Sequence, residues 1–163
     1  MNWAHLHLLL NHIPVLGTIF GLAVLAYALF RRNDDLKRLA LGTFVLVSLL
    51  ALPVYFTGEP AEHVVEHAAA VSESFVKAHE AAALLSLIGV ELLGLSALVG
   101  LYVSRGGGPL SAKIARTVLL VSLVTSGLMA RTANLGGQIR HAEIRAGAPP
   151  PPSAAEEAHD ERR

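Results

Sequence analysis

The chain contains no cysteine. This absence excludes disulfide bonds, iron–sulfur clusters held by thiolates and covalently attached c-type haem. Charge is also scarce, because only 16% of the residues are charged and the formal net charge is zero. The charge balance therefore gives no indication of a nucleic-acid partner. The chemistry left open to the chain rests on histidine, carboxylates and noncovalently bound cofactors.

The sequence contains four long apolar segments. Hydrophobic residues make up 53% of the 163 residues and the mean hydropathy is +0.50, which is too apolar for an ordinary soluble domain of this size. The composition predicts an integral membrane protein. The runs are His5 to Phe30, Leu39 to Phe56, about His79 to Val103, and a fourth from near Thr117.

Basic residues mark the two short connections between these runs. They are Arg31, Arg32, Lys37 and Arg38 in the first, and Arg105, Lys113 and Arg116 in the second. The positive-inside rule places both connections in the cytoplasm and both termini outside. Nothing basic precedes the first run, so we expect a retained helix rather than a cleaved signal. We predict a multi-pass protein of the bacterial inner membrane.

The predicted fold is all-α, an antiparallel bundle of four transmembrane helices over residues 1–145. The polar connection Thr57 to Lys77 has Glu59-Pro60 as a helix start, with acids and histidines on one side. We expect a short amphipathic helix there, at the outer interface between the second and third spans. Gly17-x-x-x-Gly21 predicts close helix packing. Residues 146–163, rich in proline and charge, should be disordered.

The stretch Ala130 to Glu143 carries a polar stripe into an apolar segment. At about 100° per residue, the stripe falls within an arc of roughly 80° and consists of Arg131, Asn134, Gln138 and His141. Polar groups are costly in a bilayer, so we expect it to point into the bundle, with Arg131 paired to Glu80, Glu66 or a cofactor propionate. Gly136 and Gly137 would allow a helix or flat ligand to approach. The predicted cofactor-binding residues are Arg131, Asn134, Gly136, Gly137 and Gln138.

All eight histidines fall on the predicted outer side. The candidate metal ligands are His12, His79, His141, His5, Glu80, His63, His67 and Glu66. His5 and His12 are roughly 10 Å apart along one helix, so they cannot share a mononuclear metal, and His12 is the deeper. His7 and His159 are expected to stay outside the site.

Two further features carry alternatives. His63 to His67 matches the H-x-x-E-H inverted zinc-protease pattern, but no catalytic domain surrounds it, and such matches arise easily in a helix rich in alanine and glutamate. Glu91 lies deep in the third run, where a proton-relay residue and a neutral hydrogen-bonded acid are equally compatible with its position.

Several motifs resemble a family of small bacterial four-helix membrane proteins without an assigned activity. They are LHLLLNHIP within His5 to Pro14, TGEPAE at Thr57 to Glu62, His79-Glu80, and RTANLGGQIRHAEI at Arg131 to Ile144. Some relatives in that family are joined to c-type cytochrome modules. The resemblance implies a neighbourhood of electron transfer and a c-type cytochrome or respiratory-complex partner.

Two functions follow from these observations. The first is a membrane protein that binds b-type haem or a His/Glu-ligated iron, copper or zinc ion near the periplasmic face and serves electron transfer. The second is a non-catalytic accessory subunit of a respiratory complex, whose polar residues form an internal hydrogen-bond network. Metal transport fits less well, because the inner halves of the helices offer no polar route.

Overall fold

The computed structural model describes residues 2–65, 73–106 and 108–147, and within these ranges it contains helices and no strand. The helices are α1 (Trp3–Leu10), α2 (His12–Arg31), α3 (Asp34–Phe56), α4 (Gly58–Val65), α5 (Glu73–Val103), α6 (Ala112–Arg140) and a 3-10 turn, η1 (Ala142–Ile144). Of the predicted tail, Ala146 and Gly147 are described and the remainder lies outside the described residues.

Four helical stretches are long and apolar enough to cross a membrane, which confirms the prediction of a membrane protein. They are Trp3–Arg31, Asp34–Val64, Glu73–Val103 and Ala112–Arg140. At about 1.5 Å per residue, each exceeds the roughly 30 Å hydrocarbon layer. The ends of the helices therefore reach beyond the hydrocarbon.

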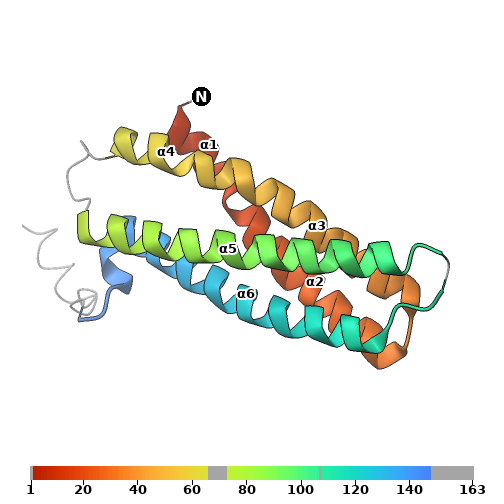
Figure 1. Cartoon of the computed structure of the whole chain (residues 1–163). Coiled ribbons are helices and arrows are strands. Elements are labelled where there is room, and N and C mark those ends of the chain that lie inside the picture. The colour runs from red at the N-terminus through yellow and green to blue at the C-terminus, as the bar shows by residue number, and fades with distance from the viewer. Residues whose placement is uncertain (1, 66–72, 107, 148–163) are drawn as a thin grey trace, which may run out of the picture.

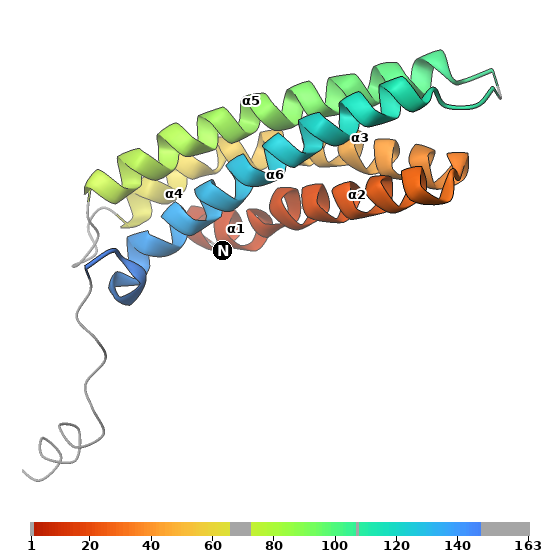
Figure 2. The ribbon, with the colours of Figure 1, turned by 90° about the horizontal axis from the view of Figure 1, so that it is seen from below.

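The four spans form a bundle in which α2 and α5 each pack against both α3 and α6. Figures 1 and 2 show the α2–α3 and α5–α6 connections together at one end, here called the loop end. The opposite end, called the histidine end, holds α1, α4, the start of α5 and the end of α6 (Figure 1). The predicted basic connections therefore lie side by side.

Glycines bring the helices close. A Cβ atom placed on Gly17 or Gly21 would lie 2.5 Å from the side chain of Val47 or Phe44, respectively, on α3. Gly94 on α5 meets α3 in the same way, since its Cβ would lie 2.5 Å from Cβ of Ser48. The close packing predicted for Gly17 and Gly21 is confirmed, and α3 is held against glycine surfaces on both sides.

The interior has two apolar layers and a set of buried hydroxyl groups. The layer nearer the loop end contains Phe44, Leu25, Leu41 and Leu93, and the second contains Val47, Ala51, Val90 and Met129. The buried hydroxyl residues of the spans are Thr18, Ser48, Thr57, Ser86, Ser122, Thr125 and Ser126. Most of them donate to a carbonyl of their own or a neighbouring helix, which offsets the cost of their burial.

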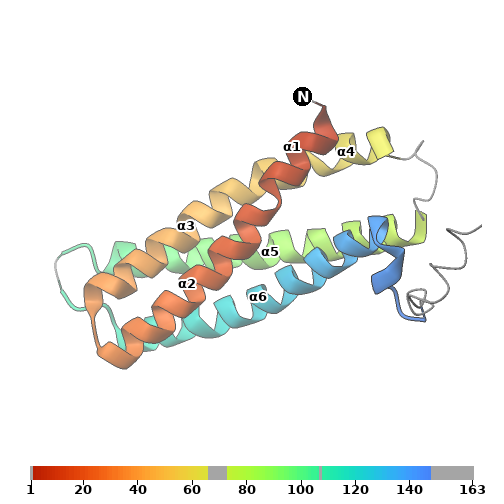
Figure 3. The same ribbon diagram turned by 180° about the vertical axis from the view of Figure 1, so that it is seen from behind.

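The first predicted run is interrupted. α1 ends at Leu10 and α2 begins at His12, with Asn11 between them. Pro14 cannot donate a hydrogen bond to the carbonyl four residues earlier, so the helix bends here, and Figure 3 shows α1 turning away from the axis of α2. The second run breaks similarly at Thr57, after Pro53, and α4 continues beyond it to pack against α1.

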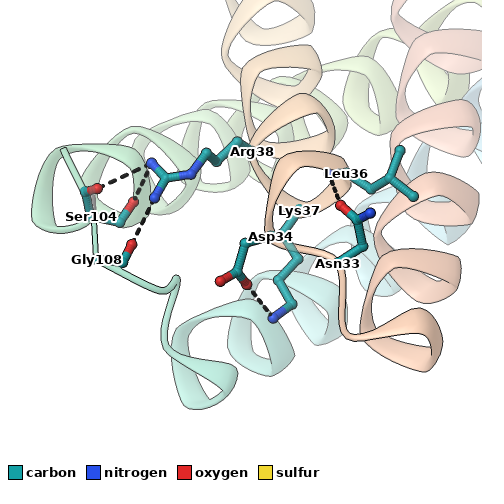
Figure 4. A network of polar contacts seen from close by, with 7 residues as sticks. All are labelled: Asn33, Asp34, Leu36, Lys37, Arg38, Ser104 and Gly108. Carbon is teal, nitrogen blue, oxygen red and sulfur yellow. Dashed lines mark hydrogen bonds and ion pairs between the residues drawn. The ribbon is translucent and has the colours of Figure 1, made fainter. Parts of the chain in front are cut away.

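At the loop end, Arg38 of α3 holds the connection between α5 and α6 (Figure 4). Its guanidinium donates from Nη1 to the carbonyl of Ser104 at 3.1 Å and from Nη2 to that of Gly108 at 2.7 Å. Asn33 caps α3 by accepting from the backbone N–H of Leu36 at 2.9 Å. These contacts tie both connections into one polar layer.

Candidate site at the histidine end

The two halves of the bundle separate at the histidine end. Here α1 packs against α4 and α5 packs against α6, while α1 and α4 make at most marginal contact with α5 and α6 in the described ranges. Figures 1 and 3 show the α1–α4 pair diverging from the α5–α6 pair. Side chains that face inward at this end therefore lie between two helix pairs with few backbone contacts, and we call this region the opening.

His7 is fixed on the α1–α4 side of this opening. Its Nδ1 lies 3.2 Å from the carbonyl oxygen of Val54 and 3.1 Å from Oγ1 of Thr57. Thr57 itself donates to the Val54 carbonyl at 2.7 Å, so its oxygen is left to accept from His7. Because a carbonyl can only accept, Nδ1 of His7 must carry the proton. Nε2 is then an unprotonated nitrogen with its lone pair available.

Sequence features explain why a histidine is needed at this point. Val54 lies in the last turn of α3, where carbonyl groups lack a helical donor. Thr57 supplies one donor to the Val54 carbonyl, and His7 supplies a second across 47 residues of chain. Asn11, one turn further along from His7 and on the same face, has its Oδ1 buried without a partner among the described residues. A buried orphan acceptor beside His7 is the feature expected where a ligand or a water molecule completes the site.

His79 is fixed in the same manner on the α5–α6 side. Its Nδ1 lies 3.0 Å from the carbonyl oxygen of Thr132, so Nδ1 carries the proton and Nε2 is again unprotonated. A Cβ atom on Gly136 would lie 3.0 Å from Cε1 of the ring, so the missing side chain leaves room for the imidazole. Ser86 and Thr132 share a hydrogen bond of 2.8 Å beneath it.

The imidazoles of His7 and His79 lie within electrostatic range of each other, although they belong to opposite helix pairs. The side of α6 next to His79 is also open. Met129 is buried, but Ala133, one turn on and on the same face, is exposed, as is Arg140 one turn beyond Gly136. The side of α6 that carries Gly136 therefore presents the small side chain of Ala133 and the cation of Arg140.

The other predicted metal ligands do not converge. His5, His12, His63, His141 and Glu80 are all exposed. Throughout the described ranges, no three His, Asp or Glu side chains form a group that could hold a metal ion. Glu66 and His67 lie outside the described residues, so the zinc-protease pattern is represented only by its first half on α4.

His141 closes α6 and turns outward. Its Nδ1 lies 2.7 Å from Oε1 of Glu143, and both side chains are exposed. A hydrogen bond from the backbone of Glu143 and a second one from His141 hold the pKa of this carboxyl below its ordinary value. The structure therefore joins His141 to an acid at the surface rather than to His12 and His79.

The predicted direction of the polar stripe is wrong. Arg131, Asn134 and His141 are exposed and Gln138 is half-buried, because the opposite side of α6 faces the bundle through Ser122, Ser126 and Met129. The spacing of these residues shows that they share one face of α6. It does not show whether that face points into the bundle or outward, because a rotated helix has the same spacing. Gln138 donates to Asn134 within the stripe.

Arg131 has no hydrogen bond or ion pair with any residue that the structure describes, so the predicted pairing with Glu80 is not present there. The two glycines differ. Gly136 faces His79, as a site residue should, whereas a Cβ atom on Gly137 would meet Ile144 of η1 at 3.4 Å. Gly137 therefore accommodates the chain end rather than the opening.

Sequence reasoning excluded His7 and favoured His12, and the structure reverses their positions. His12 is exposed at the start of α2, while His7 is half-buried against α3. The two residues point about 140° apart around a helix, so only the rotation of that helix decides which faces inward. The unsatisfied carbonyls expected at the end of α3 were the available indication of a donor such as His7.

Searches with family models, curated proteins and solved structures found no match to this chain. The resemblance to a bacterial membrane family therefore stays a prediction, and the functional argument depends on the geometry of the histidine end.

Proposed function

We propose that this chain is a b-type haem protein of the bacterial inner membrane, in which His7 and His79 would hold the haem iron and the bound group would serve electron transfer. One observation carries the proposal. Both imidazoles use Nδ1 to hold a backbone carbonyl, which leaves Nε2 unprotonated, and they belong to opposite helix pairs within electrostatic range of each other. This is the arrangement that fixes the tautomer of a metal-binding histidine.

The number of ligands favours haem over a bare metal ion. A protein site for zinc normally needs three or four side-chain ligands, and the described residues contain no group of three His, Asp or Glu. A haem brings four nitrogen ligands of its own, so two imidazoles complete the iron coordination. Copper or non-haem iron held by histidine and glutamate is correspondingly less well supported.

The surroundings fit a flat group with acidic substituents. Gly136 and Ala133 leave this side of α6 without bulky side chains. Arg140, exposed on that side of α6, is the cation suited to a propionate. Arg131, on the opposite side, is not.

When bound, haem supplies reversible one-electron transfer. The chain contributes the rest. The carbonyls of Val54 and Thr132 orient the imidazoles and raise their basicity by accepting from Nδ1. The apolar layer at Val47, Val90 and Met129 closes the site toward the interior of the bundle.

We further propose an antiparallel bundle with both termini outside. The basic residues of the loop end support a cytoplasmic location for that end, and the histidine end would then face the periplasm, with α4 at its interface. A periplasmic haem is accessible to a c-type cytochrome or a respiratory-complex partner, as the family resemblance implies.

The test is the absorption spectrum of protein extracted in mild detergent, with haem measured against protein. The parent should show a Soret band. His7→Ala and His79→Ala should each lose it, while His5→Ala and His12→Ala, which remove exposed histidines nearby, should retain it. Thr57→Val should weaken retention without removing a ligand, because it frees His7 to rotate.

A parent without a Soret band, or a full band in both His7→Ala and His79→Ala, would overturn the haem proposal. The accessory-subunit function would then be the better one. It is favoured by the outward stripe, since Arg131 and Asn134 present polar groups where a partner could meet them.

A further inference from the structure

Arg131 and Glu91 are ionisable side chains that lie well inside the spans and have no partner in the described chain. Arg131 on α6 is exposed and has no hydrogen bond or ion pair there, and Glu91 on α5 is half-buried with its Oε1 enclosed and unpaired. Charged or polar groups at such positions normally face a partner, because a bilayer leaves them unsolvated. The two groups have opposite chemistry, one a cation and the other an acid.

They do not meet within one molecule. A Cβ atom on Gly89 would touch Leu128 and Thr125 of α6 at 3.1 and 3.4 Å, so this side of α5 faces α6. Glu91 lies two residues further on, about 200° around the helix, and therefore points away from α6. Arg131 is about 200° from the buried Met129 and points away from the bundle.

Their levels along the bundle are compatible with contact between molecules. Because Gly89 lies level with Thr125 and Leu128, the Cα atom of Arg131 is nearer the histidine end than that of Glu91, by about 10 Å at 1.5 Å per residue. Side chains lean toward the N-terminus of their helix. Glu91 therefore leans toward the histidine end and Arg131 toward the loop end, which closes most of this offset.

We propose that Arg131 of one copy pairs with Glu91 of the next, so that the protein assembles head to tail into a closed ring in the membrane. The membrane fixes the orientation of every copy, so a two-fold contact through the outer face of α6 would set Arg131 against Arg131. Two different faces of opposite charge instead make a heterologous contact, which repeats until the ring closes.

Gly127 supports this use of the outer face of α6. It lies one turn from Arg131 on the same face, and a Cβ atom there would have nothing within 4 Å. The glycines Gly17, Gly21 and Gly94, by contrast, each meet a neighbouring side chain inside the bundle. An exposed glycine beside an unpaired cation allows the helix of the next copy to approach closely.

The test is charge reversal, read by native mass spectrometry of the full chain from lipid nanodiscs and mild detergent. The parent should give one oligomer larger than a dimer. Arg131→Glu and Glu91→Arg should each weaken association by more than about tenfold, because each sets like charges together. The double variant Arg131→Glu/Glu91→Arg should restore the ring, since the pair is reformed with its charges exchanged.

Circular dichroism of each variant separates loss of the ring from loss of the fold, and Arg116→Glu, at an exposed cation near the loop end, is the matched control. A monomeric parent overturns the proposal, and so does an intact ring in either single reversal. Single reversals that dissociate without rescue by the double variant also overturn it, and assign Arg131 to lipid or to another protein. None of these outcomes depends on haem.

Discussion

Replacing Gly94 with alanine should destabilise the bundle, because α5 approaches α3 closely at this glycine. The added Cβ atom would lie 2.5 Å from Cβ of Ser48 and 3.5 Å from the backbone oxygen of Phe44. Ordinary carbon contacts need about 3.5–4.0 Å. Rotating the Ser48 side chain does not move its Cβ atom, so the two helices must separate.

Gly42→Ala provides a matched control. Gly42 also lies inside a long helix, α3, but a Cβ atom there would have nothing within 4 Å. Both substitutions gain the same helix propensity, about 1 kcal/mol. The difference between their free energies of unfolding therefore isolates the contact with Ser48. Overpacking of a tight interior costs about 1–3 kcal/mol, so Gly94→Ala should be less stable than Gly42→Ala by that amount.

The assay is unfolding in mixed micelles with increasing dodecyl sulfate, followed by circular dichroism. A double-mutant cycle sharpens it. Ser48→Gly removes the clashing Cβ atom, so Ser48→Gly/Gly94→Ala should recover stability relative to the sum of the single changes, with a coupling of about 1–3 kcal/mol. Equal stability of Gly94→Ala and Gly42→Ala, or a cycle without coupling, would refute the close approach of α5 and α3.

Three further predictions concern the ends of the bundle. Arg38→Ala should remove the donors to two carbonyls of the α5–α6 connection, cost about 1–2 kcal/mol and speed its amide hydrogen exchange, and unchanged exchange would contradict the clamp. The Glu143 carboxyl should have a pKa below 4.5 when measured by NMR, and this pKa should rise in His141→Ala, so an unchanged pKa would refute the pairing. The lowered pKa stabilises the fold above pH 4.5, and this stability is lost as the pH falls through the lowered pKa. In the cysteine-free chain, Gly108→Cys should label only from the cytoplasm and Glu59→Cys only from the periplasm, whereas the reverse pattern would invert the proposed topology.

The sequence by itself determined the membrane class, the approximate spans and the grouping of the basic connections. Each depends on a local property, since hydropathy over about 20 residues decides whether a segment can cross a bilayer. The close packing at Gly17 and Gly21 was also predictable, because their spacing alone puts both on one face. The bends near Asn11 and Thr57 were harder to predict. They arise because Pro14 and Pro53 have no backbone N–H to donate within the helix.

Only the tertiary structure decided which way each helix face turns. Periodicity aligned Arg131 with Asn134 and Gln138, but their outward direction follows from the packing of Ser126 and Met129 on the other side. The register of α5 on α6 likewise brings His79 to the carbonyl of Thr132, 53 residues away. His7 replaces His12 at the opening for the same reason: a helix has one sequence pattern whatever its rotation, and contacts with its neighbours fix that rotation.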